Sequence, residues 1–186
     1  MQLYFKNMVS KSCKMIVKAE IEKLGLHCIN IELGEAEIKE NISKDKWDEL
    51  DSGLKKWGIE LMHDKQSILI EKIRNAVIES VHYAEEPLRV NFSNYLSKKL
   101  YHNYCYLANV FSKTQGITIE RFYLLHKIER VKQLIVFDDL NLKEIAWKMN
   151  YCSTAHLSHQ FKKMTGMSPG NFKKAKEKQL CALEDI

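Results

Sequence analysis

A pattern of apolar, aromatic and glycine residues occurs twice between residues 91 and 172, at a constant separation of fifty positions. The pairs are Asn91 and Asn141, Tyr95 and Ile145, Leu96 and Ala146, Tyr101 and Tyr151, Leu107 and Leu157, Phe111 and Phe161, Lys113 and Lys163, Gly116 and Gly166, and Phe122 and Phe172. A fixed period indicates repeated structural units. Two copies are too few for a solenoid, so the sequence predicts two related helical modules joined by one connector.

Each copy has the pattern of two short helices joined by a tight turn. In the first copy, Ser93 is the predicted N-cap of a helix through Lys99, residues 101–103 are the turn, and a second helix covers 104–114 before Gly116. Two short helices with a three- to four-residue turn and a polar outer face on the second helix are typical of a helix-turn-helix.

The second copy repeats this arrangement. Residues 142–149 are predicted as its first helix, and Asn150 begins the turn, where asparagine can adopt a left-handed backbone conformation. Ser153 caps a second helix that runs to Thr165, and Pro169 begins a last helix. Between the two copies, residues 118–137 are predicted to form one longer helix.

Charge is distributed unevenly along the chain. Residues 1–88 contain 13 Lys and Arg and 16 Asp and Glu, whereas residues 89–180 contain 16 and 6, respectively. A basic helical half suggests a polyanionic partner, although a solvated basic surface would have the same composition. The chain contains no apolar run of about 20 residues that could span a bilayer, and its N-terminus lacks a signal peptide. We therefore expect a cytoplasmic protein with no membrane partner.

The N-terminal half alternates predicted strands and helices. Residues 3–8, 28–33, 35–40 and 59–62 have strand patterns, residues 14–24 have helical spacing, and Ser43 caps a helix with Trp47, Leu50, Leu54 and Trp57 on one face. The order β-α-β-β-α-β predicts an α+β ferredoxin-like domain over residues 1–64. Residues 65–86 then form a connector helix whose wide apolar stripe packs either within the chain or against a second subunit. Pro87 ends it, and we expect the domain boundary between residues 82 and 90.

The N-terminal half resembles the heavy-metal-associated domain family. The family motif Met-x-Cys-x-x-Cys corresponds to Met8-Val9-Ser10-Lys11-Ser12-Cys13, so Cys13 matches the second cysteine and Ser10 replaces the first. A soft-metal site of this kind needs two thiolates held by one loop. We therefore expect no metal and no cofactor, and Cys13 is the single weak candidate ligand. The five cysteines (Cys13, Cys28, Cys105, Cys152 and Cys181) form no C-x-x-C pair.

The helical half resembles the DNA-binding domain of AraC/XylS-type transcriptional regulators. The motifs are Ile128-Glu-Arg-Val-Lys-Gln-Leu134, Leu142-Lys-Glu-Ile-Ala146 and His156-Leu-Ser-His-Gln-Phe-Lys-Lys-Met-Thr-Gly166, followed by Met167-Ser-Pro169. The resemblance implies a double helix-turn-helix domain over residues 88–178, with both recognition helices in successive major-groove segments. It also implies base contacts by Cys105, Ala108, Asn109, Thr154, Ala155, Ser158 and His159, while Lys113, Lys162 and Lys163 suit phosphate contacts.

The sequence thus predicts a DNA-binding transcriptional regulator. We expect no enzymatic activity, because no Ser/His/Asp set, paired carboxylates or Gly-rich phosphate loop is present. Its expected partners are double-stranded DNA, RNA polymerase if it activates transcription, and a second copy of the chain through the N-terminal half. The alternative is a metal-handling or sensing protein whose helical half binds a protein partner. The replacement of a motif cysteine by Ser10 and the basic charge of the helical half favour DNA binding.

Overall fold

The structure is a computed structural model that describes residues 1–84, 86–137 and 140–175. The chain divides into two compact units, Met1–Asn75 and Ala76–Ile186. The division falls within one helix and lies upstream of the boundary predicted between residues 82 and 90. Cys181 and the predicted helix-turn-helix boundary at residue 178 lie outside the described residues.

The N-terminal unit contains a small four-stranded sheet and two helices. Its elements are β1 (Gln2–Lys6), α1 (Lys11–Lys23), β2 (Cys28–Glu32), β3 (Glu35–Ile38), α2 (Lys44–Lys55) and β4 (Glu60–Leu61), in the predicted β-α-β-β-α-β order. The strand order in the sheet is β2-β3-β1-β4, and every neighbouring pair is antiparallel. In the sheet, β3 therefore lies between β1 and β2, which α1 joins, and β1 lies between β3 and β4, which α2 joins.

The core of this unit lies between the sheet and the helices, as the alternating strand patterns predict. The fully buried side chains include Leu3 and Phe5 of β1, Ala36 and Ile38 of β3, Val17 and Ile21 of α1, and Leu54 of α2. Helices α1 and α2 contact each other over this core.

Serine caps determine where the two helices begin. The Ser10 hydroxyl accepts a hydrogen bond from the backbone N–H of Cys13, so α1 begins at Lys11 rather than at the predicted position 14. The predicted cap Ser43 is confirmed, and it accepts from the N–H of Lys46. The prediction for Trp57 was wrong: α2 ends at Lys55, so this indole lies beyond the helix and is 59% exposed.

The turn between β2 and β3 requires glycine at position 34. Gly34 has a φ of +81°, and a Cβ on it would lie 2.0 Å from Nδ2 of the buried Asn75 side chain. Asn75 belongs to α3 (Lys65–Ile78), the helix in which the chain passes from one unit to the next. Earlier in α3, the carboxylate of Glu71 accepts a hydrogen bond of 3.1 Å from the backbone N–H of Asn7.

The predicted connector helix is α3 followed by a π-helical turn, η1 (Glu79–Tyr83). The sequence left open whether the apolar stripe of this helix packs within the chain or against a second subunit. In the structure the stripe is buried within the chain. The buried residues are Ile70, Ile73, Ala76, Val77, Ile78 and Val81.

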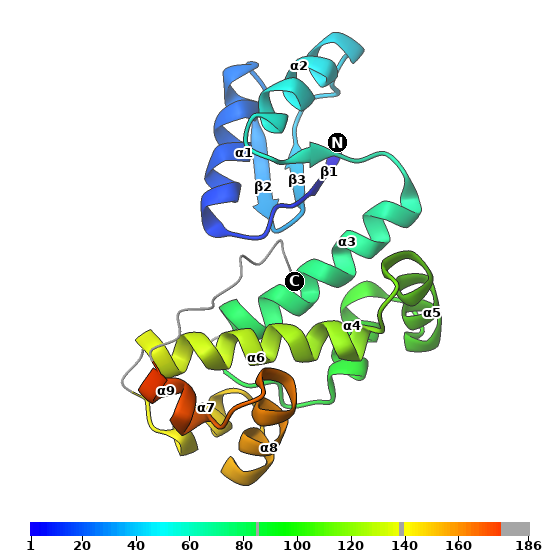
Figure 1. Cartoon of the computed structure of the whole chain (residues 1–186). Helices are drawn as coiled ribbons and strands as arrows, with labels where there is room; N and C mark the ends of the chain where they lie inside the picture. The colour runs from blue at the N-terminus through cyan, green and yellow to red at the C-terminus, as the bar shows by residue number, and fades with distance from the viewer. Residues whose placement is uncertain (85, 138–139, 176–186) are drawn as a thin grey trace. The chain divides into compact units, whose positions relative to one another are not determined.

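The second unit is helical over its described residues. After η1 it contains α4 (Phe92–Leu100), α5 (Tyr104–Gln115), α6 (Ile119–Phe137), α7 (Leu142–Lys148), α8 (Thr154–Thr165) and α9 (Pro169–Ala175). Figure 1 shows the long helix α6 running between the pair α4–α5 and the group α7–α9. The two short helix pairs α4–α5 and α7–α8 are the predicted modules, and α6 is the predicted connector. No helix in the described part of the chain is long and apolar enough to cross a bilayer.

The fifty-residue repeat is present in the structure but shifts by one residue at the turn. α4 has nine residues and α7 has seven. The left-handed turn residues are Tyr101 (φ 55°) and the predicted Asn150 (φ 53°), so they lie 49 positions apart. The pairing of Tyr101 with Tyr151 was therefore wrong. Tyr101 is 93% exposed, whereas Tyr151 is 7% exposed. The predicted N-cap Ser93 was also wrong, because Asn91 is the cap of α4.

Candidate nucleic-acid interface

The second helix of each module is fixed at both ends by local sequence signals. Asn103 caps α5, and its side chain accepts a hydrogen bond of 2.8 Å from the N–H of Cys105. Ser153 caps α8 in the same way, accepting from the N–H of His156. Gly116 and Gly166 end the two helices with φ values of 71° and 82°, which glycine adopts without steric cost. These four positions keep the fifty-residue spacing, so both helices begin and end in register.

Each helix is anchored by the same aromatic pair. The ring of Phe111 lies 5.4 Å from that of Phe122, and the ring of Phe161 lies 5.5 Å from that of Phe172. All four rings are buried, as are Leu107 and Leu157. Burial of these rings stabilises each helix against the rest of its module and leaves the opposite face outside.

The residues predicted to contact bases lie on that opposite face. In α5, Cys105 and Asn109 are exposed and Ala108 is half-buried; in α8, Ala155 and His159 are exposed, and Thr154 and Ser158 are half-buried. Each of these positions has another one three or four residues away in the same helix, as in the pairs Cys105 and Asn109, Thr154 and Ser158, and Ala155 and His159, so together they lie along one side. The structure therefore gathers the predicted base contacts into two separate strips, one on each helix.

The residues predicted to contact phosphates lie near the C-terminal ends of these strips. Lys113 is in the last turn of α5, and Lys162 and Lys163 are in the last turn of α8. All three side chains are exposed. In this position, lysine can bind the sugar-phosphate backbone that borders a groove.

Contacts that the sequence did not predict hold the ends of α5 and α8 to neighbouring segments. The Tyr104 hydroxyl at the start of α5 donates a hydrogen bond of 2.5 Å to Glu120, and burial together with this bond raises the pKa of Tyr104. The guanidinium of Arg121 contacts the sulfur of Met164 in α8 at 3.3 Å. At the start of α8, the Cys152 thiol lies 3.1 Å from Nδ1 of His156. The recognition helices are thus tied to neighbouring segments at their ends.

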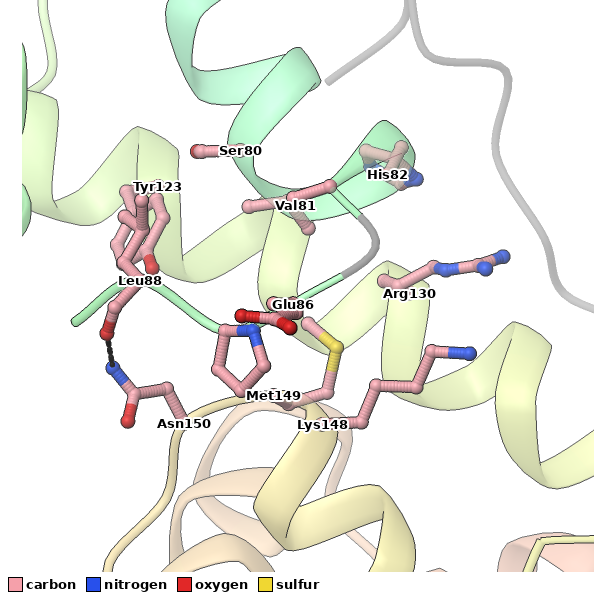
Figure 2. Close-up of a pocket in the computed structure, with 12 residues that line it drawn as sticks. Ser80, Val81, His82, Glu86, Leu88, Tyr123, Arg130, Lys148, Met149 and Asn150 are labelled. Atoms are coloured by element: carbon pink, nitrogen blue, oxygen red, sulfur yellow. Dashed lines mark hydrogen bonds between the residues drawn. The ribbon is translucent and has the colours of Figure 1, made fainter.

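A small pocket lies beside the turn of the second module (Figure 2). It is lined by residues of η1 and of the segment after it, by Tyr123 and Arg130 of α6, and by Lys148, Met149 and Asn150. The Asn150 side-chain amide donates a hydrogen bond of 3.1 Å to the backbone carbonyl of Leu88. The segment before α4 is therefore attached to the turn before α8, 62 residues later.

The imidazole of His82 reaches the interior from the same pocket. Its Nε2 lies 3.2 Å from Nδ1 of His126, a fully buried side chain of α6. Burial and the nearby Arg130 guanidinium lower the pKa of His82 to about 4, although a hydrogen bond with Gln133 acts in the opposite direction. His82 is therefore neutral at pH 7.

Residues 96–175 match the family described as a helix-turn-helix domain. The chain is also 26% identical, over 161 residues, to the uncharacterized HTH-type transcriptional regulator YtdP of Bacillus subtilis (strain 168). This match covers 81% of the chain and 20% of YtdP, so the chain spans about a fifth of the length of this curated relative. Because 81% of the chain is more than the second unit, Ala76–Ile186, contains, the similarity also includes part of the N-terminal unit.

Two solved structures were found in the comparison with this chain. One is the C-terminal domain of AraT, a response regulator from Geobacillus stearothermophilus, with a TM-score of 0.51 and 20% identity over 60% of this chain and 88% of that one. The other is the C-terminal domain of the two-component response regulator yesN from Fusobacterium nucleatum, with a TM-score of 0.48 and 26% identity over 55% of this chain and 95% of that one. The likeness to AraT concerns the fold. Together with the family match and the repeated modules, it shows that residues 96–175 of this chain form a helix-turn-helix domain.

Proposed function

We propose that this protein is a sequence-specific DNA-binding transcriptional regulator of the AraC/XylS type. The observation that carries the proposal is the pair of helices α5 and α8, each anchored by the same buried aromatic pair and each with a polar outer face. An α-helix of this kind fits the major groove, where each base pair presents a distinct pattern of donors and acceptors. The family match and the similarity to an HTH-type regulator support the proposal.

The outer faces of α5 and α8 present different side chains to the bases. In α5, the carboxamide of Asn109 can pair with adenine through two hydrogen bonds. In α8, His159 can donate to a guanine acceptor but lacks the fork geometry of arginine, and Ser158 can contact any base edge. Cys105, Ala108, Thr154 and Ala155 complete the two strips through apolar and weakly polar contacts. Because the two helices carry different base-facing side chains, they suit an asymmetric DNA site, which one chain can occupy alone.

The three lysines have a separate role. Lys113, Lys162 and Lys163 neutralise phosphates, which fixes the position of the domain but carries no sequence information. Release of counterions then makes the affinity depend on salt. RNA polymerase is a further partner if the protein activates transcription, and we propose a cytoplasmic location because the DNA target is there in bacteria.

The N-terminal unit is proposed to be a ferredoxin-like input domain. The sheet order and the separation of helix-linked strands support this arrangement. The position that would hold the first metal-binding cysteine is occupied by Ser10, whose hydroxyl caps α1 and lies 3.1 Å from the Cys13 thiol. This use of Ser10 favours regulation over the metal-handling alternative. Self-association through this unit would give a homodimer.

Binding of the full chain to duplex DNA at increasing salt tests the proposal. We expect the logarithm of the affinity to fall linearly with the logarithm of the salt concentration, with a slope of roughly −0.9 per neutralised phosphate. A selection from random duplexes should then recover a contiguous site with two unlike segments. Binding that is independent of salt, or failure to bind any duplex, would reject the proposal.

A further inference from the structure

Lys127 is a buried cation on α6 that lies against aromatic rings. Its side chain is 9% exposed, and its Nζ lies 3.9 Å from the ring centroid of Tyr151 and 5.5 Å from that of Tyr123. An ammonium within about 6 Å of a ring centroid is attracted by the negative face of the ring, and more strongly where water is excluded. The shorter of the two contacts joins α6 to the turn of the second module.

Tyr151 connects this contact to the start of α8. The residue lies two positions before the N-cap Ser153, and its backbone N–H donates a hydrogen bond of 2.8 Å to the carbonyl of Ala146 in α7. Its ring meets the imidazole of His156, in the first turn of α8, edge to face at 5.3 Å between centroids. The Tyr151 ring therefore touches α6 on one side and the second recognition helix on the other.

The first module places its tyrosine differently. Tyr101 is 93% exposed in the turn before α5, whereas Tyr151 is 7% exposed in the turn before α8. The one-residue difference in turn register accounts for this contrast, because Tyr101 itself is the left-handed residue and Asn150 takes that role in the second module. A contact through Tyr151 can therefore affect α8 without an equivalent effect on α5.

We propose that Lys127 is a positioning residue for base reading by the second recognition helix: its ammonium, held on the Tyr151 ring, fixes the direction of α8 relative to α6. This inference rests on the proposed function in DNA binding. The direction of α8 determines where Ser158 and His159 meet the base edges, and hydrogen bonds to base edges weaken steeply when their geometry is lost. Lys127 itself lies inside the domain and acts only through Tyr151.

The charge of Lys127, rather than its bulk, should matter. Burial lowers the pKa of Lys127 to about 8, so the side chain still carries its proton at pH 7. Among the described residues no carboxylate pairs with Lys127. A buried charge of this kind does not favour folding, and replacement by a neutral side chain of similar size is neutral or stabilising. Loss of base discrimination in a domain that is equally or more stable would therefore separate a positioning role from simple packing.

The first experiment compares Lys127→Met with Lys127→Arg in the full chain. Sites are selected from random duplexes with the wild-type protein, and every base pair of the selected site is then mismatched in turn. His159→Ala identifies the base pairs that α8 reads, because their mismatch penalties fall. We expect Lys127→Met to lower the same penalties by about fivefold and Lys127→Arg, which keeps the cation on the ring, to change them by less than about twofold.

Lys98→Met is the matched control. Lys98 is exposed in the last turn of α4, so its replacement removes the same charge from the same domain without disturbing an aromatic contact. We expect this variant to weaken binding equally at all sequences and to leave every mismatch penalty unchanged. Urea unfolding of each variant shows whether folding is affected.

A second pair of variants tests the ring. The Tyr151 hydroxyl is buried and has no hydrogen-bond partner in the described part of the chain. Tyr151→Phe keeps the ring face and should leave the mismatch penalties as they are, whereas Tyr151→Leu should reproduce the loss seen in Lys127→Met.

The outcomes distinguish this inference from the proposed function. A wild-type chain that selects no duplex rejects the proposed function itself. If the wild-type chain selects a site, three results would overturn the positioning role and leave the proposed function intact. The mismatch penalties could be unchanged in Lys127→Met, or they could fall equally in the two segments of the DNA site. Alternatively, Tyr151→Phe could lose as much base discrimination as Tyr151→Leu.

Discussion

The side-chain amide of Asn150 donates a hydrogen bond to the backbone carbonyl of Leu88, at a distance of 3.1 Å. Asn150 has a φ of 53°, the left-handed conformation that asparagine tolerates better than most residues. One residue thus performs two tasks: it lets the chain turn between α7 and α8, and it holds the segment that precedes α4. The second module is attached in this way to a part of the chain that lies before the first module.

These two tasks predict different costs for two substitutions. Asn150→Gly keeps the left-handed turn but removes the hydrogen bond, so we expect a loss of about 1 kcal/mol in the free energy of unfolding. Asn150→Ala removes the hydrogen bond and also strains the turn, which should cost about 1 kcal/mol more. Urea unfolding of the full chain measures both. Equal losses of unfolding free energy in the two variants would show that the backbone conformation contributes nothing. If neither variant lost stability, the hydrogen bond between Asn150 and Leu88 would contribute nothing either.

A second prediction separates base contacts from phosphate contacts in α8. His159 and Lys163 are both exposed, but His159 is on the predicted base-facing strip and Lys163 is in the last turn. His159→Ala should reduce discrimination between the selected site and its mismatched forms, by about 1–3 kcal/mol at the contacted base pair. It should leave binding to unrelated duplexes almost unchanged.

Lys163→Ala should do the opposite. Loss of one phosphate contact weakens binding at all sequences and reduces the slope of the salt dependence by about 1. Competition titrations with specific and random duplexes measure both quantities. If the two variants had the same effect on every duplex, neither assignment would stand.

Much of the helical unit could be predicted because short-range signals determine it. The anchors Phe111 and Phe161 recur at a fixed spacing, and a buried aromatic residue at helical spacing identifies the inner face. Glycine at positions 116 and 166 can adopt the left-handed C-cap conformation, so the helix ends were also predictable. The outer strips then follow, because a helix with one buried face leaves the opposite face outside.

The features that could not be predicted depend on contacts between distant parts of the sequence. The constant offset placed Tyr101 opposite Tyr151, but the first helix of each module differs in length, so only Tyr151 is buried. Nothing local to Lys127 shows that a tyrosine 24 positions later covers its ammonium. The available signal was the spacing of Tyr123 and Lys127, which lie one helical turn apart on α6.

The role of Ser10 leads to a third prediction, about metals. Its hydroxyl caps α1 and lies beside the Cys13 thiol, at the position where a second thiolate would complete a soft-metal loop. In a full chain whose exposed Cys105 and Cys152 are replaced by serine, we expect copper(I) titration to give no tight one-to-one isotherm. Ser10→Cys in this background should create such an isotherm, because two thiolates then share one loop.

Ser10→Ala is the companion variant, since it removes the cap without adding a ligand. It should lower the free energy of unfolding by about 1 kcal/mol. Tight copper binding by the chain that retains Ser10, if Cys13→Ala abolished it, would contradict the prediction and revive the metal-handling alternative.

The last prediction concerns acid and depends on the histidine pair of η1 and α6. Burial, together with the Arg130 guanidinium, lowers the pKa of His82 from 6.5 to about 4. Between these values the unfolded chain holds a proton that the folded chain lacks. The contribution of His82 to stability is therefore complete above pH 6.5 and is lost progressively as the pH falls toward 4. Acidification should thus destabilise the helical unit.

His82→Gln removes this titration but keeps a polar side chain beside His126. The difference in unfolding free energy between the wild type and this variant should decrease by about 1–2 kcal/mol from pH 7 to pH 5, because each pKa unit corresponds to about 1.4 kcal/mol. Urea unfolding of the wild type and of His82→Gln at pH 7, 6 and 5 gives both curves. A constant difference between the wild type and His82→Gln across these pH values would mean that His82 takes up its proton equally in both states, and the prediction would be wrong.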